Sequence, residues 1–353
     1  MGYREEKEHI ERVKLNKLKK ELPDYMGHFF TGIDSNTAIR TRVAYAMDLK
    51  NFLLYEKQTN PTYLRMELNQ IPIDLFENVT PFDIEEYLDY LSDYSPTDDE
   101  KCRRFNNKEA KQRKLSALRA FYKYCNRNGL IKNNPTIQVE SPKIEEKNII
   151  ILDDDERKAF MDVVLTGEGM GERQKKYHEK VAIRDFTLFT LLLGTGMRVS
   201  ELVGININDV NLKKQQIAVV RKGGDEAYIF MGNEVTGILK DYMETDRDRY
   251  IKDCPDEQAL FLSMKNQRLS IRQIEEMTKK YAAIALPHKK GKVTPHKMRS
   301  TFATNAYNLT ADAGLVANML GHSSPAITLK RYAKMDTKRV EDVANKISKM
   351  LDE

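Results

Sequence analysis

Four side chains near the C-terminal end have types and spacing that suit chemistry on a phosphate ester. His296 and Arg299 are three residues apart, so they would share one face of a helix. His322 follows a glycine, and Tyr332 comes ten residues later in a basic run. Imidazole, guanidinium and phenol groups together suit attack on phosphorus without a metal ion. The spacing therefore predicts a phosphoryl-transfer site with Tyr332 as its nucleophile.

Such a site needs groups that this segment does not contain. Negative charge grows on the non-bridging oxygens, and a second guanidinium, Arg198, could help Arg299 to hold them. The leaving oxygen needs a proton, which Lys222 could supply from the tip of a hairpin. A phenol with a pKa near 10 becomes a useful nucleophile only in such a cationic pocket.

Each signal also has a plainer interpretation when it is taken alone. A His-x-x-Arg pair is usually a surface pair, and a tyrosine beside basic residues is usually packed. Lys222 precedes two glycines and could belong to a simple turn. The sequence Gly194-Thr195-Gly196 could be a helix stop, because the Gly-Lys-Ser/Thr of a phosphate loop does not follow it.

Positive charge is concentrated in one part of the chain. The 353 residues carry a net charge of +5, but positions 101–132 hold eleven Lys or Arg against one acidic residue, Glu109. This distribution is typical of proteins that bind a phosphate backbone, although a solvated helix face is the alternative. The candidate DNA-binding residues on the predicted helix 108–127 are Lys111, Arg113, Lys114, Arg119 and Lys123.

The cysteines and the apolar runs limit the class of protein. Cys102, Cys125 and Cys254 are few and far apart, so we expect neither a disulfide framework nor a metal cluster. The N-terminal segment is charged, and no apolar run approaches the length of a membrane span. The chain is therefore predicted to be cytoplasmic and nucleoid-associated, with no membrane partner.

The elements that must position these residues suggest two domains. Residues 1–140 predict an all-helical, DNA-binding module of four or five helices. Residues 141–149 contain a proline and charges without a core pattern, so we expect a linker there. Residues 150–353 form the predicted catalytic domain. The fold class is then mainly α with a small antiparallel β-sheet.

Within the second domain, short runs indicate where the sheet lies. Residues 216–220 and 227–231 alternate like strands around a Gly-containing loop and predict a β-hairpin. We expect a loop at 167–180, a turn at 208–212, and a helix that ends at 194–196.

The sequence resembles the tyrosine recombinase (phage integrase) family. The resemblance is carried by 192–202 (LLGTGMRVSEL), 220–224 (VRKGG), 296–299 (HKMR), 320–324 (LGHSS) and Tyr332. Its layout is similar to the Xer group, particularly the single-recombinase XerS type. Two departures are Arg221, where a glycine is common, and the ten-residue step from His322 to Tyr332.

The resemblance implies a role for each matching residue. Arg198 and Arg299 would bind the scissile phosphate, His296 would assist proton transfer, and His322 would hydrogen-bond the phosphate. Lys222 would protonate the leaving 5′-hydroxyl, and Tyr332 would form a 3′-phosphotyrosyl link. Glu201 would support the site by orienting its neighbours. The resemblance implies no metal or nucleotide cofactor.

The implied function is site-specific recombination of duplex DNA through a Holliday junction, with chromosome dimer resolution as the expected role. The implied assembly is a homotetramer on synapsed DNA, in which a C-terminal helix at 340–351 docks on a neighbouring protomer. A DNA translocase is a further candidate partner. Three alternatives stay open: an integrase of a mobile element, a type IB topoisomerase-like enzyme, and a non-catalytic DNA-binding regulator.

Overall fold

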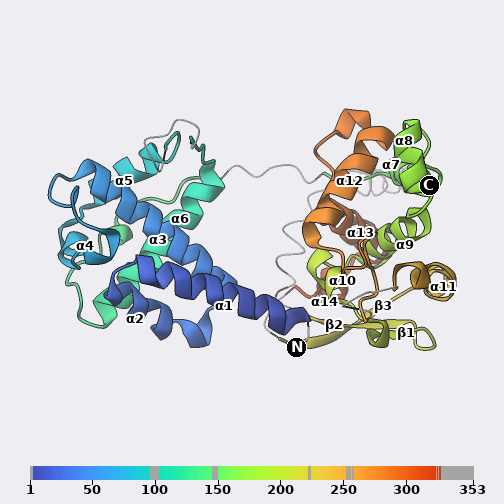
Figure 1. Cartoon of the computed structure of the whole chain (residues 1–353), viewed down its shortest axis with the longest axis horizontal. Coiled ribbons are helices and arrows are strands. Elements are labelled where there is room, and N and C mark those ends of the chain that lie inside the picture. The colour runs from blue at the N-terminus through green and yellow to red at the C-terminus, as the bar shows by residue number, and fades with distance from the viewer. Residues whose placement is uncertain are drawn as a thin grey trace, which may run out of the picture. The chain divides into compact units, whose positions relative to one another are not determined.

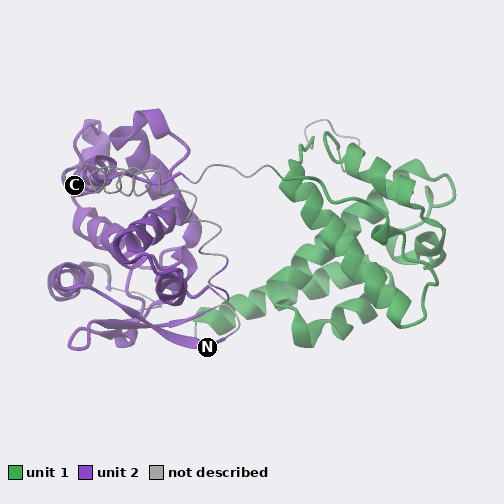
Figure 2. Cartoon of the chain, turned by 180° about the vertical axis from the view of Figure 1, so that it is seen from behind, with its two compact units in different colours: residues 1–146 green, residues 147–353 purple. Residues whose placement is uncertain are grey.

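The chain forms two compact units, residues 1–146 and 147–353, in a computed structural model (Figure 2). The structure describes residues 3–95, 103–144, 150–221, 224–251, 256, 258–322, 324 and 326. The boundary between the units falls within 141–149, the segment expected to be a linker. The assignment of the units as DNA-binding and catalytic domains stays a prediction.

Helices joined by loops make up most of the described part of unit 1 (Figure 1). Its helices are α1 (Tyr3–Glu21), α2 (Asp24–Gly32), α3 (Ile39–Thr59), α4 (Asp74–Asn78), α5 (Pro81–Tyr90) and α6 (Lys108–Arg127). There are six described α-helices rather than the four or five expected. α2 and α4 have only 9 and 5 residues, too few to give a clear helical period.

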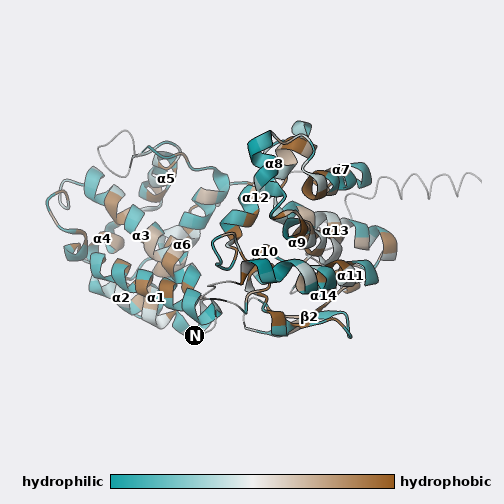
Figure 3. Ribbon diagram, turned by 45° about the vertical axis from the view of Figure 1, so that its right-hand side comes forward, coloured by the Kyte–Doolittle hydropathy of each residue, from teal (hydrophilic) through white to brown (hydrophobic). Residues whose placement is uncertain are grey.

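The ends and the apolar face of α6 follow from its sequence. The Asn107 side chain caps the helix by accepting from the Ala110 backbone N–H at 2.9 Å. Leu115, Leu118, Phe121 and Tyr122 lie on one face and are buried. Brown and teal residues accordingly alternate along the helices of unit 1 in Figure 3.

Aromatic rings hold the core of unit 1 together. Phe121 of α6 contacts Phe76 of α4 and Phe29 of α2, with ring centroids 4.7 and 5.4 Å apart. Phe52 of α3 meets Tyr87 of α5 edge-on at 5.0 Å. Such pairs stabilise a core beyond the area they bury.

Unit 2 combines helices with one small sheet (Figure 1). Its helices are α7 (Asp154–Thr166), α8 (Glu172–His178), α9 (Ala182–Thr195), α10 (Val199–Gly204), α11 (Asn233–Asp241), α12 (Ile271–Ala285), α13 (Pro295–Thr310) and α14 (Ala313–Leu320). The strands β1 (Val210–Asn211), β2 (Gln216–Val220) and β3 (Glu226–Phe230) pair antiparallel in that order. The fold class predicted from the sequence is confirmed.

Two local predictions in unit 2 were wrong. The segment 167–180 contains α8, whose buried residue His178 donates from Nε2 to the Val164 carbonyl at 2.7 Å. Only one of the seven residues of α8 is buried, so the segment has no periodic apolar pattern and its sequence looks like that of a loop. The segment 208–212 contains β1, which is too short to show the alternation of a strand.

A buried polar network joins α9 to α12. Tyr281 donates to Asp185 at 2.6 Å, and Arg184 donates from Nε to the same carboxylate at 2.9 Å. The Tyr281 ring also packs edge-on against Phe189, 5.8 Å between centroids. These contacts fix α9, the helix that leads into the candidate site.

In the described part of the chain, no helix is long and apolar enough to cross a membrane.

Glu56 of α3 is an exception to the pairing of buried charges. It is 7 % exposed, and its Oε1 has no hydrogen-bond partner. Burial, reinforced by the negative charge of Asp83, raises its pKa from 4.5 to about 7.

We expect Glu56→Gln to change how stability depends on pH. The folded state binds more protons than the unfolded state between pH 4.5 and 7, so the wild type loses stability as pH rises through that window. The variant lacks this loss. Its free energy of unfolding, relative to that of the wild type, should therefore rise by up to about 3 kcal/mol from pH 4.5 to 8. Hydrogen exchange of α3 peptides in increasing urea measures the free energy of unfolding. Glu85→Gln, at an exposed carboxylate of α5, should keep the wild-type profile; an identical profile for Glu56→Gln would contradict the assignment.

Candidate active site

The site begins where α9 ends. Gly196 terminates this helix in a left-handed conformation, φ 64°, with its N–H bonded to the Leu192 carbonyl. A β-carbon at this position would lie 2.3 Å from the Phe302 ring. Glycine is therefore required both by the backbone conformation and by the close approach of α13.

Arg198 follows as the N-cap of α10 and is paired with Glu201 one turn later. Its Nη1 donates to Glu201 Oε1 at 2.7 Å, and its backbone N–H donates to Glu201 Oε2 at 2.8 Å. Glu201 is 8 % exposed, whereas a third of the Arg198 side chain is accessible. The buried carboxylate thus holds the guanidinium at the surface of the site.

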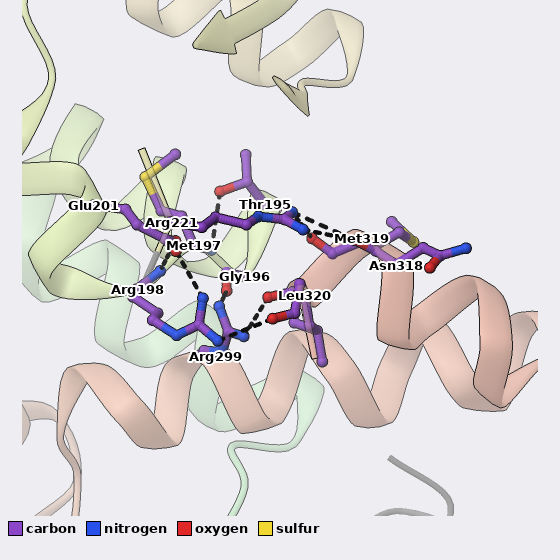
Figure 4. A network of polar contacts seen from close by, with 11 residues as sticks. Thr195, Gly196, Met197, Arg198, Glu201, Arg221, Arg299, Asn318, Met319 and Leu320 are labelled. Carbon is purple, nitrogen blue, oxygen red and sulfur yellow. Dashed lines mark hydrogen bonds and ion pairs between the residues drawn. The ribbon is translucent and has the colours of Figure 1, made fainter. Parts of the chain in front are cut away.

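Arg299 reaches the same place from α13. It is 4 % exposed, and it donates from Nη1 to the Gly196 carbonyl at 2.9 Å and from Nη2 to the Leu320 carbonyl at 2.6 Å (Figure 4). Thr294 caps α13 by accepting from the Lys297 N–H, and Pro295 takes the first helical position. Arg299 therefore links the ends of α9 and α14.

The C-terminal end of α14 is the meeting point of these side chains. Gly321, at φ 64°, ends the helix, and the His322 N–H bonds back to the Ala317 carbonyl at 2.9 Å. Arg198 Nη2 donates to the Gly321 carbonyl at 3.2 Å. Arg198 and Arg299, 101 positions apart in the sequence, are brought to one helix end.

A third arginine at this helix end was not predicted from the sequence. Arg221, at the end of β2, donates to the Asn318 and Met319 carbonyls at 3.3 Å (Figure 4). Its guanidinium covers Gly321 so closely that a β-carbon there would lie 2.3 Å from Nη1. In the sequence, Arg221 stands out only as a departure from a common glycine. It holds the base of the β2–β3 hairpin against α14.

The other predicted catalytic residues are described in part. His322 is half-buried directly after Gly321, and His296 is exposed in the first turn of α13, where it lies three residues before the buried Arg299. Lys222 and Tyr332 lie outside the described residues, as does the segment 340–351. The structure thus brings Arg198, Glu201, Arg299 and His322 to one end of α14, and the catalytic roles stay predictions.

The predicted DNA-binding residues of α6 differ in their surroundings. Lys114 is 4 % exposed and donates to Asp48 Oδ1 of α3 at 3.2 Å, and Arg113 pairs with the other oxygen of Asp48. Burial raises the pKa of Asp48, which the two cations partly offset. Removal of one partner from such a buried pair is strongly destabilising. Lys114 therefore stabilises the packing of α3 on α6.

Two more of these residues donate hydrogen bonds to other parts of unit 1. Arg119 donates to the Val139 carbonyl at 2.6 Å and to the Ser141 hydroxyl at 2.7 Å, so it fastens the end of unit 1 to α6. Lys111 donates to the Ser92 hydroxyl at 2.6 Å. Lys123 and Arg113 are exposed.

Comparison with known proteins identifies the family. A family model described as the phage integrase family matches residues 151–339, more than half of the chain. The chain belongs to the phage integrase family. The predicted resemblance is confirmed, and the chain is an Xer-like DNA tyrosine recombinase. The finer likeness to the XerS type stays a prediction.

Relatives match over nearly the whole chain. It is 28 % identical to tyrosine recombinase XerC of Caldanaerobacter subterraneus subsp. tengcongensis, over 97 % of this chain and 90 % of the relative. It is 31 % identical to tyrosine recombinase XerD of Staphylococcus saprophyticus, over 89 % of this chain and 92 % of the relative.

Solved structures share the fold. The XerH recombinase bound to a palindromic difH substrate, a post-cleavage complex, aligns with TM-score 0.63 and 19 % identity over 95 % of this chain and 94 % of that one. A lambda integrase tetramer bound to a Holliday junction aligns with TM-score 0.58 and 15 % identity over 87 % and 76 %.

The contact between Arg221 and Gly321 can be tested in this recombinase. Gly321→Ala should displace the guanidinium from the α14 carbonyls, and Arg221→Ala should remove it. We expect both changes to slow DNA strand cleavage about tenfold, because both release the strand end that precedes Lys222 in the sequence. Cleavage of labelled duplex DNA measures the rate.

The double variant provides the control. When the guanidinium is also removed, the β-carbon introduced by Gly321→Ala no longer meets it, and about 1 kcal/mol of left-handed backbone strain remains. The double variant should therefore cleave DNA no more slowly than Arg221→Ala within about twofold. Fully additive losses would show that the two residues act independently.

Proposed function

We propose that this recombinase cuts and rejoins a specific duplex DNA site through a 3′-phosphotyrosyl intermediate on Tyr332 and a Holliday junction. The observation that carries the proposal is the convergence of Arg198 and Arg299 on the end of α14. Both guanidinium groups donate to backbone carbonyls and are ionised at any relevant pH, so both can bind a phosphate; Arg198 is in addition oriented by its ion pair with Glu201.

The proposed reaction assigns one step to each group. The Tyr332 phenolate attacks phosphorus, the bond to the 5′-oxygen breaks, and Lys222 gives that oxygen a proton. Arg198 and Arg299 donate to the non-bridging oxygens, where charge develops. His322 hydrogen-bonds the same phosphate and His296 assists proton transfer. Rejoining reverses these steps with a 5′-hydroxyl of the partner strand as the nucleophile.

Glu201 is a positioning residue in this scheme. Its carboxylate accepts hydrogen bonds from both the backbone N–H and the side chain of Arg198, and these bonds fix the orientation of the guanidinium. Since Glu201 is buried behind the arginine, it would not meet the phosphate itself.

We further propose that the chain acts as a homotetramer on two synapsed duplexes in the cytoplasm. The DNA-bound XerH complex supports DNA as the partner, and the lambda integrase tetramer bound to a Holliday junction supports the assembly. The XerC and XerD relatives favour chromosome dimer resolution over integration of a mobile element.

Replacement of the nucleophile gives the most direct test. Tyr332→Phe should abolish covalent capture of DNA from a library of nicked duplexes, because it removes only the attacking oxygen. A denaturing gel detects the protein–DNA adduct. Tyr228→Phe changes an exposed tyrosine of β3 and should form the adduct normally.

The same assay separates the alternatives. Adducts enriched for one sequence support a recombinase, whereas adducts without sequence preference, together with relaxation of any plasmid, support a topoisomerase-like enzyme. An adduct that persists in Tyr332→Phe would sink the proposed nucleophile.

The DNA-binding role of α6 predicts a change in salt dependence. Lys123 is exposed on α6, and Lys123→Ala should lower affinity for a duplex and reduce the slope of log K against log salt by about 1. Fluorescence anisotropy over a salt series measures this slope. Lys57→Ala on α3, beside Glu56, should leave it unchanged; equal slopes for wild type and Lys123→Ala would remove Lys123 from the interface.

A further inference from the structure

A cavity of about 620 Å³ lies in unit 1, and none of the residues that line it belongs to α6. Its walls come from the end of α3, the segment after it, α4 and α5, which neighbour one another in Figures 1 and 3. Its lining includes four carboxylates, Glu56, Asp83, Glu86 and Asp89, and among the lining residues none is Lys, Arg or His. The cavity would therefore repel the phosphates of DNA and attract a cation.

One of these carboxylates lacks the partner that a buried charge requires. Glu56 is more than nine-tenths buried, and its Oε1 accepts no hydrogen bond. Its backbone carbonyl, in contrast, accepts from the Asn60 N–H at 2.9 Å. Buried polar side chains in native proteins are almost always satisfied. An unsatisfied carboxylate that lines a cavity points to a donor that enters from outside.

Tyrosine rings provide the other half of a cation site. Tyr55, Tyr63 and Tyr90 line the same cavity. Tyr55 and Tyr90 lie 4.9 Å apart between ring centroids, and the Tyr90 hydroxyl is fixed by donation to the Ser95 carbonyl at 3.0 Å. Aromatic faces attract ammonium and guanidinium groups.

The arrangement fits an organic cation better than a metal ion. In the residues that the structure describes, no three His, Cys, Asp or Glu side chains are close enough together to hold a metal. Asp83 is also partly engaged, because it accepts from the Thr80 N–H at 2.7 Å. Carboxylates spread around a cavity of this size suit a longer cation with several methylene groups.

We propose that this cavity binds an alkylammonium or guanidinium group, with the charge on Glu56 and the hydrocarbon part against the tyrosines. The group could come from a free polyamine or from a Lys or Arg side chain of a partner protein. The lining residues belong to unit 1 and the proposed DNA cleavage residues to unit 2, so the test needs no DNA and stands apart from the proposed function.

The test uses the full chain, without DNA, at constant ionic strength. Spermidine binding is measured by isothermal titration calorimetry, and hydrogen exchange should show added protection in α3 and α5. Glu56→Gln should weaken binding at least about tenfold, since it removes a charge-assisted contact. Glu86→Gln/Asp89→Asn, which leaves Glu56 in place, should also weaken binding. Glu85→Gln is the matched control on α5 and should bind like the wild type.

A second arm distinguishes the two sources. An acetylated tetralysine amide is titrated under the same conditions and in competition with spermidine. Tighter binding of the peptide indicates a basic segment of a protein partner, and tighter binding of spermidine indicates a free polyamine. The proposal is overturned if neither probe binds, or if both variants in the cavity bind like Glu85→Gln.

Discussion

The carbonyl groups at the C-terminal end of α14 are the interaction on which the candidate active site depends. Three arginines from separate elements donate to them: Arg198 from the start of α10, Arg299 from α13, and Arg221 from the end of β2. Carbonyls in the last turn of a helix have no intrahelical partner and carry partial negative charge. These carbonyls hold the guanidinium groups together without adding a full negative charge. The Glu201 carboxylate that pairs with Arg198 offsets only part of the positive charge of the three arginines, so a positive potential remains available for a phosphate.

The positions of these arginines also depend on how the ends of α9 and α14 are packed. Gly196 ends α9 and gives its carbonyl to Arg299, while Gly321 ends α14 and gives its carbonyl to Arg198. Both glycines have positive φ, and both are overlaid by a side chain from another element. A shift of α14 would therefore move all three arginines at once. Because a displacement of about 1 Å can greatly slow a positioned reaction, the packing of α14 bears directly on catalysis.

The sequence was sufficient for what depends on residue type and local period. The bounds of α6 and the strand β2 could both be predicted, since each depends on neighbours a few residues away. Contacts between residues that are far apart in the sequence could not be predicted in this way. Nothing near Arg221 indicates that it lies over Gly321, and nothing near Lys114 indicates that Asp48 of α3 will bury it. Counting charges therefore predicted a basic segment correctly but could not separate its exposed cations from its structural ones.

The same helix, α3, carries two buried carboxylates with opposite outcomes. Asp48 is paired with Lys114 and Arg113, while Glu56, eight residues and about 12 Å further along the axis, is paired with neither Lys nor Arg among the described residues. Selection for stability alone would favour a neutral or paired residue at Glu56, because an unpaired buried carboxylate destabilises the fold. Proteins break such local rules mainly where function requires it. The contrast along α3 therefore supports the proposal that Glu56 faces a cationic ligand.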